Sequence, residues 1–194
     1  MKVIGLYAHK NGIIGFGDRL PWTCKSDMQH FRRITDGEVL IVGGNTARSL
    51  PPLINRTVIA VSSKDEPIER ADYTVKSPYD AVVLASQINK TGRCFVIGGA
   101  SLLDNMTEYL DGLIVSIIKV DLHPDAEGSD DLIGLGDTFC NWCDSSVESG
   151  LFTNGYCEGG QKLIDMIDFD IYATGVINRM TQDEVEAVLK SKPF

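Results

Sequence analysis

Asp27 is an acidic residue on what should be the apolar side of a helix. If the segment 25–34 after Pro21-Trp22 is helical, Asp27, Phe31 and Ile34 fall at i, i+4 and i+7 on one face. A carboxylate buried there costs several kcal/mol unless a buried group hydrogen-bonds to it. Two interpretations fit: a first-turn carboxylate stabilised by the helix dipole or acting as a cap, or a functional acid in a pocket.

Glycine pairs end two predicted strands. The apolar runs 39–42 and 94–97 lead into Gly43-Gly44 and Gly98-Gly99, and a helical pattern follows each pair. Glycine lets the backbone approach a ligand closely, and a helix N-terminus offers free N–H groups to phosphate. For either pair taken alone, a tight strand-to-helix turn is the preferred interpretation. No G-x-G-x-x-G pattern is present, so the sequence does not support a standard Rossmann fingerprint.

Cys140 and Cys143 have the spacing of a metal-binding or redox pair, with Cys157 and His123 as candidate further ligands. Most zinc sites show a second such pair, so we interpret the spacing as chance and expect no metal site. The odd total of five cysteines argues against a disulfide framework.

The composition is typical of a globular domain. The chain has 194 residues, 43% of them hydrophobic and 23% charged, which predicts a single domain over 1–194. The net charge of −9 argues against a nucleic-acid partner. No apolar run approaches the ~20 residues of a membrane helix, and the first residues lack the features of a signal peptide. We therefore expect a cytoplasmic protein with no membrane partner.

Short apolar runs alternate with helical patterns, which predicts an α/β fold with a mixed, mostly parallel central sheet flanked by helices. The predicted strands are 3–8, 39–42, 56–62, 73–76, 94–97, 113–120 and 169–177. The predicted helices are 25–34, 46–50, 78–89, 100–110 and 181–190, the last opened by a Thr181–Glu184 capping box. Residues 11–18 read as a glycine-rich loop, and 121–160 cannot be assigned.

A set of short motifs is spread over the first half of the chain: Ile13-Ile14-Gly15, Leu20-Pro21-Trp22, Asp27, Phe31, Thr35, Gly43 with Thr46, Arg56, Ser62-Ser63 and Val96-Ile97-Gly98-Gly99. These motifs resemble dihydrofolate reductase, in that family's order and at nearly its spacing. The resemblance covers about 1–120 well and the last third loosely. It implies a single dihydrofolate-reductase-like domain with a loop insertion near 121–160 and an added C-terminal helix.

The implied activity is reduction of 7,8-dihydrofolate to tetrahydrofolate by hydride transfer from NADPH, feeding one-carbon and thymidylate metabolism. Asp27 would accept hydrogen bonds from the 2-amino group and a ring N–H of the pterin. It would also favour protonation of N5 by water, without donating the proton itself. Trp22 would hold an ordered water beneath the lid, the loop Gly15–Leu20. A plain core tryptophan is the alternative for Trp22. We expect a monomer.

The resemblance also implies further substrate contacts. Arg56 would form a forked pair with the α-carboxylate of the folate glutamate, although a surface cation before a strand is an alternative. Ser116 takes the place of a family threonine that bonds to the acid corresponding to Asp27. The implied substrate positions are Gly5, Leu6, Asp27, Phe31, Leu53, Arg56 and Ser116.

The cofactor positions show departures from the family. Gly44 and Ser101 stand where many members carry basic residues, and Leu103 replaces an aromatic near the nicotinamide. Ser63 and Lys76 remain as phosphate contacts, so NADPH is the expected cofactor, with weakened selectivity over NADH as a hypothesis. The implied cofactor positions are Tyr7, Ile14, Gly15, Leu20, Gly44, Asn45, Thr46, Ser62, Ser63, Lys76, Gly98, Gly99, Ala100, Ser101 and Leu102.

Alternatives stay open at this stage. One is a related pterin or pyrimidine reductase, but the smaller substrates of such an enzyme lack the glutamate tail that Arg56 would bind. Another is a folate- or nucleotide-binding protein without turnover, which the altered cofactor pocket would suit. A small metal-binding module is a third candidate. Two segments, 127–130 and 136–139, both resemble the family's Gly-Asp-Thr loop.

Overall fold

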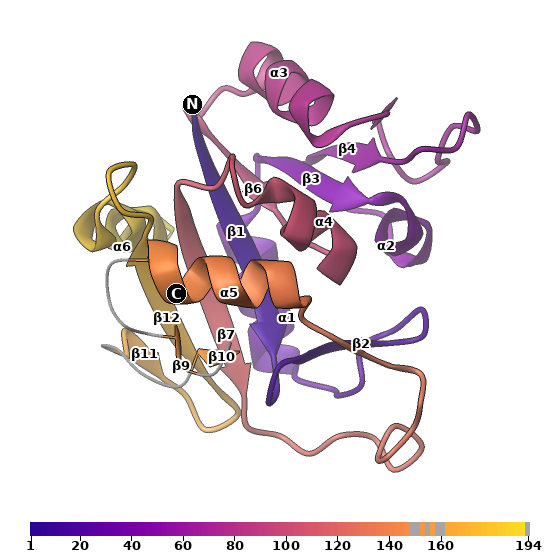
Figure 1. Ribbon diagram of the computed structural model, residues 1–194, viewed down its shortest axis with the longest axis vertical. Helices are drawn as coiled ribbons and strands as arrows, with labels where there is room; N and C mark the ends of the chain where they lie inside the picture. Colours follow the sequence, from indigo (N-terminus) through magenta and orange to yellow (C-terminus); the bar gives the residue numbers. More distant parts are fainter. Residues whose placement is uncertain (148–151, 154–155, 158–161, 193–194) are drawn as a thin grey trace.

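The computed structural model describes residues 1–147, 152–153, 156–157 and 162–192, and its centre is one large sheet. Eight strands of the described chain form it in the order β11-β12-β7-β1-β6-β3-β4-β5 (Figure 1). The six strands from β7 to β5 are parallel, whereas β12 and β11 add antiparallel pairings at one edge. The strand bounds are β1 Lys2–His9, β3 Val39–Gly43, β4 Thr57–Val61, β5 Tyr73–Val75, β6 Arg93–Val96, β7 Gly112–Ile118, β11 Ile164–Asp165 and β12 Phe169–Gly175. The predicted mostly parallel sheet is confirmed.

Continuous apolar runs form the centre of this sheet. Leu40, Ile41 and Val42 of β3 are fully buried, as are Phe95 and Val96 of the adjacent β6. A strand that is covered on both faces needs apolar residues at every position rather than at alternate ones. This is why the two runs could be recognised as interior parallel strands.

Helices cover both faces. On one face, α3 (Pro78–Ile88), α4 (Ala100–Met106) and α5 (Asp137–Ser146) contribute to one apolar cluster. On the other face, α1 (Lys25–Ile34) and α6 (Gln182–Lys190) pack in a second cluster. Figure 1 shows α4 and α5 in front of the sheet and α1 behind it. The short α2 (Gly44–Ser49) follows β3 directly.

The helix ends follow local signals closely. The Ser77 hydroxyl accepts the N–H of Asp80, with Pro78 at the first helical position of α3. The capping box between Thr181 and Glu184 opens α6, as predicted. One end was predicted wrongly: α4 ends at Met106 rather than near Leu110. Met106 and Leu110 are both fully buried, so the apolar spacing continues past the end of the helix.

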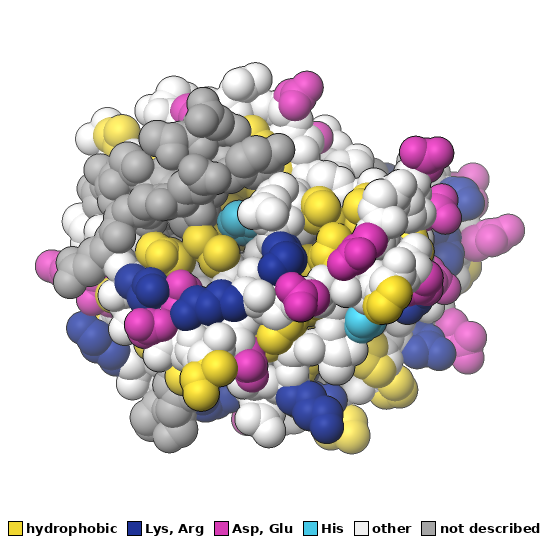
Figure 2. All heavy atoms as spheres, turned by 90° about the horizontal axis from the view of Figure 1, so that it is seen from below, with side chains coloured by type: hydrophobic (Ala, Val, Ile, Leu, Met, Phe, Trp, Pro, Cys, Tyr) yellow, Lys and Arg dark blue, Asp and Glu magenta, His cyan; other side chains and the backbone are white. Residues whose placement is uncertain are grey.

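Two segments for which the sequence predicts no helix or strand, 11–18 and 121–160, contain such elements in the structure. The residues 11–18 are not a plain loop, because β2 (Ile13–Phe16) pairs antiparallel with β8 (Leu132–Gly134). The unassigned stretch contains α5 and two short paired strands, β9 (Phe152–Thr153) and β10 (Tyr156–Cys157). Figure 2 looks onto the end of the molecule that carries β2, where basic and acidic side chains are interspersed with apolar ones.

Candidate active site

Asp27 lies on the buried side of α1, where the helical spacing places it. Asp27 is only 6% exposed to solvent. Burial raises the pKa of the Asp27 carboxyl above its ordinary value, and a hydrogen bond from the Ser116 side chain on β7 lowers that pKa in part. A buried carboxyl whose pKa is raised by desolvation and which has a specific hydrogen-bond partner is a candidate functional acid.

Apolar side chains surround this acid. Leu6, Trp22 and Ile34 are buried in the cluster beneath α1, and Phe31 and Leu53 pack half-buried against it. The cluster therefore joins five positions from β1, α1 and the loops before and after it. Gly5 has a packing role of its own, because a Cβ there would come within 2.7 Å of Leu113 Cδ2 on the adjacent strand.

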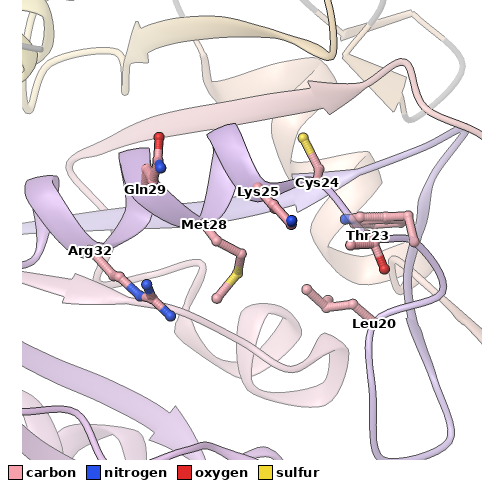
Figure 3. A pocket seen from close by; sticks show the side chains of 8 residues that line it. Leu20, Thr23, Cys24, Lys25, Met28, Gln29 and Arg32 are labelled. Carbon is pink, nitrogen blue, oxygen red and sulfur yellow. The ribbon is translucent and has the colours of Figure 1, made fainter.

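The Trp22 indole N–H is available for a ligand or water. Its Nε1 is buried and has no hydrogen-bond partner among the described residues. Trp22 also lines a cavity of about 320 Å³, together with Leu20 and Met28. In Figure 3 Met28 and Leu20 approach one another across this cavity. A buried donor beside an open space is a position where an ordered water binds.

Arg56 is fastened at the C-terminal end of α1 rather than free on the surface. Its Nε donates to Thr35 Oγ1 at 3.1 Å, and its Nη1 and Nη2 donate to the carbonyl oxygens of Ile54 and Arg32. A guanidinium has five N–H donors, so two remain for an external acceptor. The Arg56 guanidinium is therefore held in one orientation by three hydrogen bonds to its own chain, and its role as a carboxylate-binding residue stays a prediction.

The two glycine pairs meet at adjacent strand ends. The Gly43 N–H donates to the Gly98 carbonyl at 2.8 Å, and a Cβ on Gly99 would lie 2.9 Å from Thr46 Oγ1. The helices α2 and α4 begin at these glycines, and neither N-terminus has a side-chain cap within the described part of the chain. The sequence therefore brings together backbone donors and small residues of the kind that hold phosphate groups.

Position 44 is sterically crowded. It is buried, and a Cβ there would lie 3.0 Å from the Ser62 Cβ and 3.2 Å from the Ile68 Cδ1. A larger residue requires both neighbours to shift. Ser62 is itself 8% exposed, and its Oγ accepts the N–H of Lys64.

Two cations remain near this position, Lys64 in the loop after β4 and Lys76 directly after β5. The Lys76 ammonium donates to the Lys64 carbonyl at 2.7 Å and pairs with Asp65 at 2.7 Å, close to exposed Ser63. The contact with Lys76 lowers the pKa of Asp65. Lys64, an exposed cation directly after Ser62-Ser63, was not among the predicted positions, and its place in that loop was the available signal.

The remaining cofactor positions lie either in the apolar cluster on the α5 face or on the helices α2 and α4. Tyr7 and Leu102 lie in the apolar cluster on the α5 face, where the Tyr7 ring meets the Phe139 ring edge-on at 5.5 Å and half-buried Ile14 packs nearby. Ala100 and Ser101 open α4, and the Asn45 side chain on α2 accepts a hydrogen bond from Arg48.

The lid is tied to the segment after β7. The Gly17 N–H donates to the Asp131 carbonyl at 3.1 Å, and Arg19 forms an ion pair with Asp125. A Cβ on Gly15 would touch Ile133 at 3.5 Å. Of the two segments resembling a Gly-Asp-Thr loop, 136–139 opens α5 and 127–130 precedes β8. The lid contacts at 125, 131 and 133 were not predicted, because only the tertiary fold brings them together.

The cysteine pair lies on α5, where Cys143 is buried and Cys140 half-exposed. Within the described residues, no group of three or more His, Cys, Asp or Glu side chains is placed to hold a metal ion. The Cys157 side chain lies outside the described residues. No described helix combines the length and the apolar character that a membrane crossing requires.

Comparison with known proteins identifies the family. The family model for dihydrofolate reductase matches residues 3–129. The dihydrofolate reductase of Ureaplasma parvum serovar 3 is 38% identical over 111 residues, 56% of this chain and 69% of that protein. That of Bacillus subtilis is 34% identical over 119 residues, 61% of this chain and 67% of that protein.

A solved structure agrees in fold. The dihydrofolate reductase of Enterococcus faecalis, complexed with NADP(H) and RAB-propyl, superposes with a TM-score of 0.69 at 19% identity, covering 91% of this chain and 97% of the other. At that identity the likeness supports the fold alone. The family match over residues 3–129 and the identity to curated relatives support more: this chain belongs to the dihydrofolate reductase family.

Proposed function

We propose that this protein reduces 7,8-dihydrofolate to tetrahydrofolate with NADPH, in support of one-carbon and thymidylate metabolism. The observation that carries the proposal is the Asp27 carboxyl, buried in an apolar cluster and hydrogen-bonded by Ser116, in a chain of this family. Such a carboxylate needs partners, and the amino and ring N–H groups of a pterin supply two.

Asp27 orients the substrate and sets the local electrostatics. A two-point hydrogen bond fixes the pterin ring in the plane that hydride transfer requires, which lowers the entropic cost of reaction. The Trp22 N–H, which no described residue accepts, holds a water close to the ring. N5 takes its proton from water, and the negative charge of the Asp27 carboxylate beside the ring favours that protonation. Phe31 and Leu53 pack on the benzoyl part, and Arg56 receives the glutamate carboxylate.

The cofactor side fits a dinucleotide. The uncapped starts of α2 and α4 offer N–H donors, and the contact between Gly43 and Gly98 keeps side chains out of the space between them. Ser63, Lys64 and Lys76 are the polar and cationic groups near a 2′-phosphate, in place of a basic residue at Gly44. When bound, NADPH supplies the hydride.

The alternatives are weaker. A pterin or pyrimidine reductase would leave the anchored Arg56 fork without a carboxylate to bind. A binding protein without turnover is favoured only by the changed cofactor positions. We place the protein in the cytoplasm as a monomer without a nucleic-acid partner.

An absorbance assay tests the function. Reduced-nicotinamide absorbance should fall when dihydrofolate is added, and an antifolate should stop it. Because Gly44 gives no cationic contact, kcat/KM with NADPH should exceed that with NADH by no more than about tenfold, or about 1.4 kcal/mol. No turnover with either cofactor contradicts the function. A much larger gap contradicts only the weakened selectivity.

Ser116→Ala should raise the pKa of Asp27. The Ser116 hydroxyl donates to the ionised carboxylate and so favours the charged form. Removing it should move the titration of Asp27 to higher pH. NMR titration of a 13C-labelled Asp27 carboxyl measures this change. Ser116→Thr keeps the hydroxyl and is the matched control. An unchanged or lowered pKa in the alanine variant contradicts the assignment.

A further inference from the structure

His123, on the segment after β7, is the most accessible of the three histidines in the chain. It is half-buried, whereas His9 and His30 are 2% and 1% exposed. Burial lowers the pKa of His9 and of His30 to about 4, so both remain neutral well below neutral pH. A histidine that water can reach gains or loses its proton between about pH 5 and 8.

His123 contacts both chain neighbours of Trp22. The His123 N–H donates to the Pro21 carbonyl at 2.7 Å, and the imidazole Nε2 lies 2.8 Å from Thr23 Oγ1. These two contacts bracket the buried indole whose Nε1–H no described residue accepts. In Figure 3 Thr23 and Leu20 lie together at one end of the cavity that Trp22 lines. Trp22 is therefore held in place from a segment about a hundred residues further along the chain.

The lid reaches the same imidazole. Arg19 Nη1 of the lid lies 3.5 Å from His123 Nδ1, and the same guanidinium pairs with Asp125. A guanidinium only donates hydrogen bonds, so Nδ1 is the acceptor and the proton of the neutral ring is on Nε2. The Nε2–H group then donates to Thr23 Oγ1. Both nitrogens of the neutral imidazole thus have a partner, one in the lid and one beside Trp22.

A second proton on His123 reverses the contact with the lid. The new Nδ1–H group faces the Arg19 N–H groups, donor against donor, and two positive charges lie side by side. Asp125, on the same segment as His123, offsets part of this repulsion, but it already pairs with Arg19. Pro21 and Thr23 face the ring from the segment before α1 and carry no charge. Protonation therefore weakens the lid contact and leaves the contacts beside Trp22 in place.

We propose that His123 is a positioning residue, whose neutral imidazole couples the lid to the segment around Trp22 and whose protonation detaches the lid. Its effect on turnover rests on the proposed function, because Trp22 acts there through the water that its N–H holds. Its effect on the lid does not, because the contacts join residues of the protein alone.

NMR titration of the wild type tests the lid contact. The imidazole resonances of His123 and the amide resonances of the lid should titrate with one midpoint between about pH 5 and 8. The Gly17 N–H donates to the Asp131 carbonyl, and its protection from exchange should fall about two- to fivefold across this transition. That is the effect of losing one partly exposed polar contact. A lid that does not respond while His123 titrates overturns the proposal.

Arg19→Gln gives the reciprocal test. Removing the positive charge beside the ring favours the protonated imidazole, so the titration of His123 should move to higher pH. An unchanged midpoint, or one at lower pH, overturns the contact between Arg19 and His123.

Two replacements of His123 test its effect on turnover. His123→Ala should lower kcat/KM for dihydrofolate about two- to tenfold, the effect of losing one or two net hydrogen bonds. His123→Gln keeps an amide donor and acceptor, so it should retain most of the rate and abolish the response of the lid to pH. Glu127→Gln is the matched control, because Glu127 is exposed on the same segment and its replacement should change neither property. If His123→Ala does not fold, the wild-type titration and the glutamine variant decide.

The outcomes separate this inference from the proposed function. Absence of turnover in the wild type contradicts the proposed function, and the lid titration then decides the inference by itself. A wild-type rate in His123→Ala, or a lid response that persists in His123→Gln, overturns the positioning role while the proposed function stands.

Discussion

Asp27→Asn should lower turnover of dihydrofolate at neutral pH by roughly two or more orders of magnitude, as expected when a positioned ionisable group is lost. The amide offers one oxygen acceptor where the carboxylate offers two, and it adds N–H donors that face the N–H groups of the pterin. It also removes the charge that supports protonation of N5. Steady-state kinetics across pH measure the loss.

The same variant should be more stable than the wild type at neutral pH. Burial raises the pKa of Asp27 in the folded protein. Its stabilising contribution is therefore present below the unfolded pKa and is lost as pH rises through the folded pKa. Asparagine has no ionised form, so the advantage of the variant should grow with rising pH and vanish in acid. Thermal unfolding at several pH values measures this.

Exposed Asp183 on α6 offers the matched control, Asp183→Asn, which should leave turnover unchanged. Wild-type-like turnover in Asp27→Asn would mean that the buried acid has only a structural role. A lower melting temperature for that variant at neutral pH would contradict the unfavourable burial of the charge.

Phe139→Ala should lower the free energy of unfolding by about 3–5 kcal/mol, the usual effect of emptying an aromatic core position. Phe139 is fully buried and packs against the rings of Tyr7 and Trp142. It anchors α5 to the sheet, so its loss leaves a cavity that the helix cannot easily close. The melting temperature should fall by roughly 6–20 °C.

Denaturant titration measures the change in stability, and Asn141→Ala is the control. Asn141 is exposed on the same helix, so its replacement should alter stability by about 0.5 kcal/mol or less. A loss below about 1 kcal/mol in Phe139→Ala would show that α5 is not a substantial part of the core.

Local signals explain which elements could be predicted. The spacing in α1, the apolar runs of β3 and β6, Ser77-Pro78 before α3 and the Thr181–Glu184 box all lie within one segment of chain. By contrast, α5 receives an N-terminal hydrogen-bond partner from another helix, since Asp104 Oδ1 accepts the Phe139 N–H at 2.8 Å. The pairing of β2 with β8 joins segments more than a hundred residues apart, and neither has a strong strand pattern of its own.

The candidate site divides in the same way. Helical spacing alone placed Asp27 inward, and the resemblance to the family placed Ser116 beside it. The Trp22 N–H, which has no hydrogen-bond partner in the described part of the chain, is a result of tertiary packing and leaves no local pattern. The sequence also could not show that Gly44 is crowded by Ser62 and Ile68.

That crowding constrains any redesign of coenzyme choice. An arginine introduced at position 44 requires Ser62 and Ile68 to give way by a few tenths of an ångström, so its effect depends on whether these two packed neighbours can move. Position 64 imposes no such condition, because its side chain is already exposed. Retargeting this scaffold between the two nicotinamide dinucleotides is thus sterically unconstrained in the loop and conditional on the packing of Ser62 and Ile68 at the start of the helix.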